Sequence, residues 1–225
     1  MEYTIIGETF PLIEITLTAP DRIYCQSHAV MYLDANAAFS TRVTGGGIKG
    51  LKRMFIREPL FLNEIAVIDP NQPCVVGVAG TGIGKIVPVA ITPTTSYLFQ
   101  KGAFLAAEST VDLDIAFTKK IGAGLFGGEG FMFQYLHGNG MVFAKTFGDV
   151  HTLRLADGET IRVNTGRIVG FEHTVKYDID RVRGASSILF SGEGLFFSTL
   201  TGPGTVILQS GLAPQSKTTT FSEVV

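Results

Sequence analysis

Residues 125–145 read LFGGEGFMFQYLHGNGMVFAK, and sixty-four residues later the chain repeats this stretch as LFSGEGLFFSTLTGPGTVILQ, residues 189–209. Ten of the twenty-one positions are identical. The same spacing aligns FLAAESTVDLDI, residues 104–115, with IVGFEHTVKYDI, residues 168–179. A gapless register over forty-two residues indicates an internal duplication, so the fold is built from repeated units.

Each copy predicts a β-hairpin. Apolar residues alternate in FMFQYL and again in MVFA, and Gly138-Asn139-Gly140 lies between the two runs. In the second copy the turn is Gly202-Pro203-Gly204, where proline fixes φ and needs no strand partner. We therefore expect equivalent core environments for the pairs Phe133/Phe197 and Leu136/Leu200.

Composition points to one compact β protein over residues 1–225. Charged residues make up 17% and apolar residues 45% of the chain, and 27 glycines with 17 phenylalanines suit short strands and tight turns. The net charge of −2 provides no general basic field, so we expect no nucleic-acid partner.

Location is predicted from three further features. The first residues lack a basic segment followed by an apolar core, and no run of eighteen apolar residues occurs, so we expect neither secretion nor a transmembrane segment. Cys25 and Cys74 lie far apart without a metal-binding motif, as buried free thiols of a reducing compartment would. The cytoplasm fits best.

A third, diverged unit is expected near the N-terminus. Residues 23–36 can be laid over the start of both repeats, with Val30 at the position of Val111 and Val175. An insertion at residues 45–57 then accounts for the greater length of this copy. The expected units are about 20–95, 100–150 and 165–212.

The repeated Gly-Glu-Gly tripeptide supplies the candidate ligand residues. Glu129 and Glu193 occupy equivalent positions in the two repeats, and Glu58 falls near them in the third alignment. We favour a structural role, in which the glycines make a bend and each glutamate pairs within its own unit. The alternative is a shared pocket in which the carboxylates raise one another's pKa and hold a cation or cationic ligand.

Residues 48–57, IKGLKRMFIR, form the only cationic cluster and are the candidate surface-interaction segment. On a helix, Ile48, Leu51 and Phe55 would share one face, which favours a short helix packed on the sheets. Contact with an anionic membrane surface or a partner groove is the other interpretation, although the segment is too short to bind a membrane strongly alone. Its basic residues are Lys49, Lys52, Arg53 and Arg57.

Catalytic and cofactor motifs are missing from the sequence. The four histidines form no HxH or HxxxH pair, and no GxSxG occurs. Gly80 to Lys85 resembles a phosphate loop, but Ile86 follows the lysine where serine or threonine is required. We expect no catalytic residues, no metal and no cofactor.

The ordered motifs resemble the altered-inheritance-of-mitochondria (mitochondrial biogenesis) family, whose bacterial members are small proteins of unknown function. They are GAFLAAESTVDLDIAFTKKIGAGLFGGEGFMFQYLHGNGMVF, LADGETIRVNTGRIVGFEHTVKYDI, LFSGEGLFFSTLTGPGTVILQS and GGGIKGLKRMFIREPLFLN, and the match covers roughly residues 20–212. The resemblance implies repeated units with a fold like the tryptophan RNA-binding attenuator protein, a double-stranded β-helix or sandwich, and assembly into rings or trimers. It implies no catalytic residues.

The sequence therefore predicts an all-β, cytoplasmic, non-enzymatic homo-oligomer that serves as a scaffold or interaction protein for an unknown partner. Similar units can offer similar sheet edges to neighbours, and a trimer is the expected size. The alternative function is a small-molecule or cation-binding protein, or a cryptic enzyme, that uses the Gly-Glu-Gly carboxylates.

Overall fold

The computed structural model describes residues 1–43, 61–100, 102–117, 132–180 and 197–212. The N-terminal strands are β1 (Glu2–Ile6), β2 (Leu12–Leu17), β3 (Arg22–Gln26), β4 (Val30–Leu33), β5 (Ala37–Val43), β6 (Phe61–Val67) and β7 (Cys74–Ala79). The central strands are β8 (Ile86–Ile91), β9 (Tyr97–Gln100), β10 (Phe104–Glu108), β11 (Val111–Phe117), β12 (Met132–Gly138) and β13 (Gly140–Lys145).

The C-terminal elements are β14 (Val150–Leu155), β15 (Thr160–Asn164), a 3-10 turn (Thr165–Arg167), β16 (Ile168–Glu172), β17 (Lys176–Asp180), β18 (Phe197–Thr201) and β19 (Gly204–Gln209). Every strand pair is antiparallel. The predicted all-β, antiparallel fold class is confirmed.

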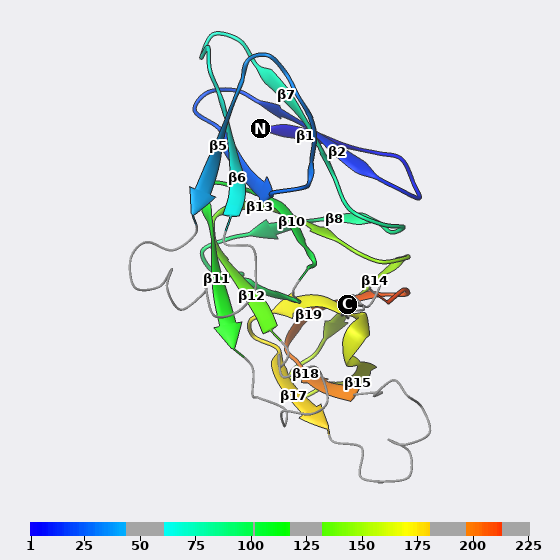
Figure 1. Cartoon of the computed structure of the whole chain (residues 1–225). Coiled ribbons are helices and arrows are strands. Elements are labelled where there is room, and N and C mark those ends of the chain that lie inside the picture. Colours follow the sequence, from blue (N-terminus) through cyan, green and yellow to red (C-terminus); the bar gives the residue numbers. More distant parts are fainter. Residues whose placement is uncertain (44–60, 101, 118–131, 181–196, 213–225) are drawn as a thin grey trace, which may run out of the picture.

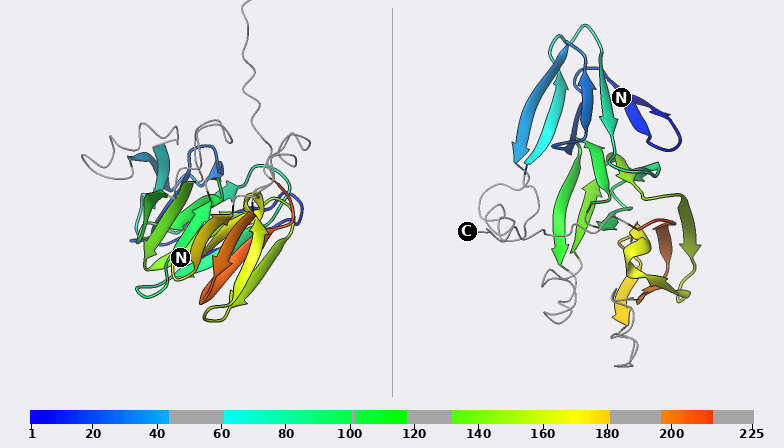
Figure 2. Two further views of the ribbon diagram at one scale, coloured as in Figure 1. Left: turned by 90° about the horizontal axis from the view of Figure 1, so that it is seen from below. Right: turned by 45° about the vertical axis from the view of Figure 1, so that its right-hand side comes forward.

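The strands form four sheets that follow one another along the molecule. Their orders are β1-β2-β7-β4, β5-β6-β3-β10-β13-β8, β11-β12-β9-β16-β19-β14 and β15-β18-β17. In Figure 1 the blue N-terminal strands lie at the top, the green strands in the middle, and β15, β17 and β18 at the bottom. The right-hand view of Figure 2 shows the same progression. Chain order and spatial order therefore agree.

Strand registers recur at a spacing of sixty-four residues, and they do so upstream of the sequence repeat as well. Ile86 opposite Lys145 in the β8–β13 pair corresponds to Val150 opposite Gln209 in the β14–β19 pair. Five of the seven pairs of β11 with β12 recur in the five pairs of β17 with β18. Even the irregularity after Phe104 in β10–β13 recurs after Ile168 in β16–β19.

The first unit follows the same plan with a different spacing. The β4–β7 pair is irregular between Val30 and Tyr32, as β10–β13 is after Phe104. Val30 therefore corresponds to Phe104, and Ala37, which begins the pairing with β6, corresponds to Val111. The alignment of Val30 with Val111 was wrong, because a single apolar residue cannot fix register where apolar residues recur at every second position.

From these registers we infer three units of six strands each. They comprise β2 to β7 (residues 12–79), β8 to β13 (residues 86–145) and β14 to β19 (residues 150–209). In the first unit, residues 68–73 separate β6 from β7, where Asn139 alone separates β12 from β13. Part of the extra length of this unit lies there, in addition to the segment between β5 and β6.

The buried core contains Phe133, Leu136 and Leu200, but Phe197 is only half-buried. Phe133 makes edge-to-face contacts with Phe171 and Tyr177, at centroid distances of 5.1 Å each. Phe197 begins β18, in the terminal three-stranded sheet. The expectation of equal environments thus holds for the leucine pair and is wrong for the phenylalanine pair.

We expect Phe133→Ala to lower the free energy of unfolding by about 3–5 kcal/mol, because it removes a fully buried ring and leaves a cavity. Phe197→Ala should cost clearly less, since its ring is partly in water. Chemical denaturation of both variants under conditions that keep the chain monomeric would measure the difference. Equal losses would contradict the burial of these two rings.

Candidate assembly interface

Successive units are joined by strand pairing. Strand β3 of the first unit pairs with β10 of the second, and β9 of the second pairs with β16 of the third. We call each of these pairings a junction. Each junction fuses three strands of one unit with three of the next, and this produces the two six-stranded sheets.

The two junctions have the same register. Cys25 opposite Ala106 in the first corresponds to Phe99 opposite Gly170 in the second. A backbone hydrogen bond closes each one: Ser109 N–H donates to the Arg22 carbonyl at 2.9 Å, and His173 N–H donates to the Ser96 carbonyl at 2.9 Å. The junction is therefore a repeated structural element of the chain.

Side chains at the first junction are buried and closely packed. The Tyr24 ring stacks on Phe104 with centroids 5.5 Å apart, and its hydroxyl donates to the Val111 carbonyl at 3.0 Å. At the second junction the Phe99 ring covers Gly170, where an added Cβ would lie 2.1 Å from the ring. Gly170 is thus required for the close approach of this ring.

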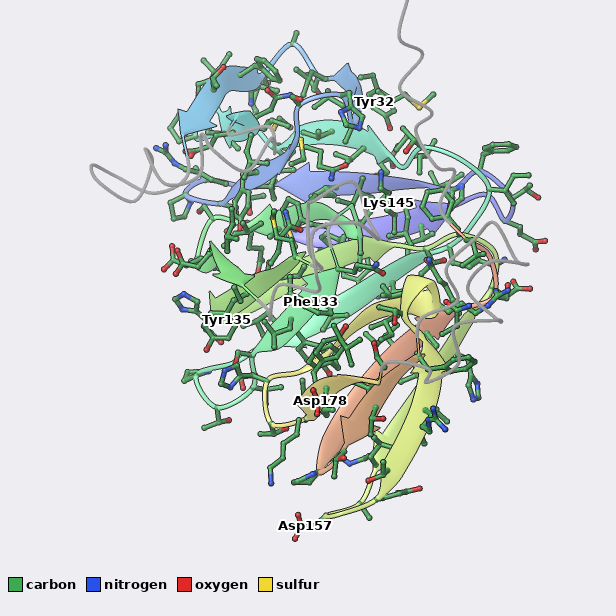
Figure 3. The ribbon with its side chains drawn as sticks, turned by 60° about the horizontal axis from the view of Figure 1, so that its bottom comes forward. Tyr32, Phe133, Tyr135, Lys145, Asp157 and Asp178 are labelled. Carbon is green, nitrogen blue, oxygen red and sulfur yellow. The ribbon has the colours of Figure 1, made fainter. Side chains whose placement is uncertain are left out.

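Two strands occupy junction positions without a junction partner in the described part of the chain. Strand β4 corresponds to β10 and β16, and it is the last strand of the first sheet. Strand β15 corresponds to β3 and β9, and it is the last strand of the three-stranded sheet. Figure 3 shows Tyr32 of β4 near one end of the molecule and Asp157, in the turn before β15, at the other.

Apart from β1, which lies at the edge of the first sheet and belongs to no repeated unit, the other sheet edges recur within the chain. Strands β5, β11 and β17 are edges in all three units, and β8 and β14 are edges in the second and third. Pro88 in β8 has no N–H to offer to an added strand, a common protection of edges. Among the described strands, β4 and β15 are the junction strands that have a neighbour on one side only.

The residues of β4 are more exposed than their counterparts in β10 and β16, which have a junction partner. Strands β10 and β16 each have four consecutive buried residues, whereas no residue of β4 is buried. Met31 is 62% exposed, while its counterparts Leu105 and Val169 are 0% and 1% exposed. Met31 therefore lies in a position that the fold buries wherever a junction forms.

Tyr32 is held in place beside this edge. Its ring lies over Gly77, since a Cβ on that glycine would come within 2.2 Å of the ring. Its hydroxyl donates to Glu14 Oε2 at 2.5 Å, and this hydrogen bond raises the pKa of the tyrosine. Tyr32 is 39% exposed, and its contacts with Gly77 and Glu14 fix the orientation of its ring.

Apolar side chains on adjoining strands repeat this contrast. Across the second junction Tyr177 of the third unit packs on Phe133 of the second. Phe39 corresponds to Tyr177 in the first unit and is 51% exposed. Phe197 corresponds to Phe133 in the third unit and is half-buried, with the Arg162 guanidinium 5.8 Å from its ring centroid. The exposed surface at each end thus extends beyond the strand edge.

The candidate residues predicted from the sequence lie outside the described residues. These are Glu58, Glu129, Glu193, Lys49, Lys52, Arg53 and Arg57. In sequence, Glu58 precedes β6 by three residues, and Glu129 precedes β12 by three. Whether the glutamates serve one pocket or three separate turns stays a prediction.

A polar and aromatic cluster that spans the second and third units was not predicted. The Tyr135 ring stacks on His137 at 4.9 Å and contacts His173 at 5.1 Å, and His137 Nε2 lies 3.2 Å from Asp114 Oδ2. Within the described ranges, no three His, Cys, Asp or Glu side chains are grouped to hold a metal ion. The cluster is a stack of partly exposed rings in which His137 is hydrogen-bonded to Asp114.

Lys145 is a buried cation at the end of β13, 8% exposed. Its ammonium group donates to Thr81 Oγ1 at 3.0 Å, and burial lowers its pKa. No carboxylate of the described residues pairs with it. The corresponding residue of the third unit, Gln209, is neutral and accepts a hydrogen bond from Phe147 N–H at 2.9 Å. Burial of the Lys145 charge therefore lowers the stability of the fold more than burial of the neutral Gln209 side chain does.

Cys25 and Cys74 are free and buried, as predicted. Burial raises the pKa of the Cys25 thiol to about 12 and also raises that of Cys74. Both thiols are therefore protonated near neutral pH and inert towards thiol reagents in the folded chain.

The duplication extends upstream in the structure, but the sequence signal there is too weak to reveal the open edges. At the spacing of sixty-four residues, IVPVAI (residues 86–91) aligns with VHTLRL (residues 150–155), and YLFQ (97–100) aligns with IRVN (161–164). These pairs share alternation of apolar residues but no identity. Alternation alone marks strands without marking which strand is unpaired.

Known proteins resemble this chain over most of its length. The sequence profile of the family described as mitochondrial biogenesis AIM24 matches residues 3–211. An uncharacterised protein of Streptococcus pyogenes serotype M6 is 29% identical over 217 residues, which are 89% of this chain and 82% of that protein. The crystal structure of a Streptococcus pyogenes protein superposes with a TM-score of 0.74 at 25% identity, covering 94% of both chains.

None of the helices in the described residues is long and apolar enough to cross a bilayer.

We expect Lys145→Met to raise the free energy of unfolding by about 1 kcal/mol at pH 7, because it removes a buried charge that lacks a carboxylate partner. Thr81 is exposed and can bond to water instead. Lys85→Met is the control, since Lys85 Nζ reaches the Glu8 carbonyl near solvent.

The pH dependence gives a second readout for Lys145. Its pKa is lower in the folded chain than in the unfolded chain, so between these two values the unfolded state binds more protons and stability rises with pH. Between pH 7 and pH 10 the unfolding temperature of the wild type should therefore rise towards that of Lys145→Met. A constant gap, or a less stable variant, would contradict this assignment.

Proposed function

We propose that this chain, which belongs to the mitochondrial biogenesis AIM24 family, is a homo-oligomeric scaffold whose copies associate through the β4 and β15 edges. The observation that carries the proposal is the exposure of Met31 at a position buried in both other units. Covering a methionine of this size by a partner is worth about 1.5–3 kcal/mol.

Open strand edges support self-association in a second way. An unpaired strand presents a row of backbone N–H and C=O groups, which is a template for pairing with another chain. Both edges are flanked by partly exposed aromatic rings, Tyr32 and Phe39 at one end and Phe197 at the other. Pairing and apolar burial would thus act together, as they do in strand-addition complexes.

We propose further that the protein is non-enzymatic and cytoplasmic, with a trimer as the expected assembly. Two buried free thiols suit a reducing compartment. The relative compared above is itself uncharacterised and therefore supplies no activity to transfer. The proposed role is that of a scaffold that presents repeated surfaces to a partner protein.

Light scattering at micromolar concentration should give a mass above the 24.1 kDa of one chain. Met31→Lys should shift the protein towards the monomer, because a charge at this edge opposes strand addition. Ile83→Lys is the matched control, since Ile83 is 58% exposed but lies away from both edges. It should leave the mass unchanged.

A wild-type protein that remains a monomer over this concentration range would overturn the proposal. So would equal dissociation by Met31→Lys and Ile83→Lys, since the β4 edge would then have no special part in assembly.

A further inference from the structure

We propose that copies of this chain join head to tail, with β15 of one copy adding to β4 of the next in the register of the two internal junctions. This inference rests on the proposed self-association and specifies its geometry. The new contact would fuse the three-stranded sheet of one copy with the first sheet of the next. The result is a seven-stranded sheet, β17-β18-β15 followed by β4-β7-β2-β1.

The register follows from the internal junctions. In the second junction Phe99 lies opposite Gly170. The residue of the third unit that corresponds to Phe99 is Val163, and the residue of the first unit that corresponds to Gly170 is Tyr32. The proposed junction therefore places Val163 opposite Tyr32. The neighbouring pairs follow in the same way: Arg162 opposite Leu33, and Ile161 opposite Asp34. The closing hydrogen bond, formed by His173 N–H and the Ser96 carbonyl in the second junction, corresponds to Ala35 N–H and the Thr160 carbonyl.

Side-chain sizes fit this register. The second junction sets a large ring on β9 against a glycine on β16, and the proposed junction sets Val163 of β15 against Tyr32 of β4. The Tyr32 ring already lies over Gly77, so its remaining face is the surface that is offered. Behind it, Phe39 of one copy would pack on Phe197 of its neighbour, as Tyr177 packs on Phe133 within the chain.

The interface is heterologous, because two different strands meet. The edges lie near opposite ends of the molecule (Figure 3), so one chain cannot satisfy both. Repetition of such a contact closes into a ring if the rotation per copy allows, and otherwise gives a filament. Pairing of two β4 edges would leave β15 open and has no counterpart within the chain.

Complementation between two variants tests the head-to-tail geometry. Tyr32→Lys blocks the β4 edge and Val163→Lys blocks the β15 edge, so each variant alone should be a monomer. Mixed at equal concentration, they retain one intact junction, while the other would place two lysines opposite each other. We expect a species of twice the 24.1 kDa chain mass in light scattering, and nothing larger.

Cross-linking tests the register without blocking assembly. Cys25/Ala106 and Phe99/Gly170 lie three positions from the closing hydrogen bonds, so they are non-hydrogen-bonded pairs, with Cα atoms about 4.5 Å apart. That separation permits a disulfide. The double variant Tyr32→Cys, Val163→Cys should form disulfide-linked multimers under mild oxidation, because its two native thiols are buried.

The matched control is Tyr32→Cys with His151→Cys, which places the second thiol on the exposed edge strand β14. It should not cross-link, and neither should either single variant. Circular dichroism and thermal unfolding establish that every variant is folded.

The outcomes separate this inference from the proposed function. A monomeric wild type overturns both. Folded Tyr32→Lys and Val163→Lys variants that keep the wild-type mass overturn both as well. If both variants dissociate, the inference alone is overturned when their mixture stays monomeric or when only the control pair cross-links. Dissociation of both variants, a dimer on mixing and cross-linking of the Tyr32/Val163 pair together support it.

Discussion

Hydrogen bonding between β3 and β10, and again between β9 and β16, ties each unit to the next and makes sheets that no unit forms alone. Sheet pairing demands continuation, since an edge strand leaves a row of donors and acceptors unsatisfied by protein. Within the chain, two such edges are paired, one at each junction. These two pairings bury Leu105 and Val169, require a glycine at position 170 and fix the position of Tyr24.

Alternating apolar residues and glycine turns were enough to predict an all-β fold, because strand periodicity is local. The identities at a spacing of sixty-four residues also gave the correct register for the second and third units. They did not give the first unit, in which Val30 was aligned with Val111 instead of Phe104. Nor did they distinguish Phe133 from Phe197, because burial depends on what covers a residue from another unit.

The interface residues could not be identified from the sequence for the same physical reason. Met31 and Tyr32 read as ordinary strand residues, and only comparison with buried counterparts makes their exposure informative. Charged motifs, such as the Gly-Glu-Gly tripeptides, are easier to recognise in a sequence because they indicate ligand binding or catalysis. An interface built from backbone pairing and apolar rings leaves almost no motif.

The alternation of units between shared sheets also has a consequence for synthesis on the ribosome. Strand β3 is complete once residue 26 has been added, but its neighbour β10 begins only at Phe104. The first and second units can therefore complete their shared sheets only after the following unit has been synthesised. A chain released before that point would keep an unpaired strand edge. Synthesis from the N-terminus thus exposes, for a time, an edge equivalent to that of β15.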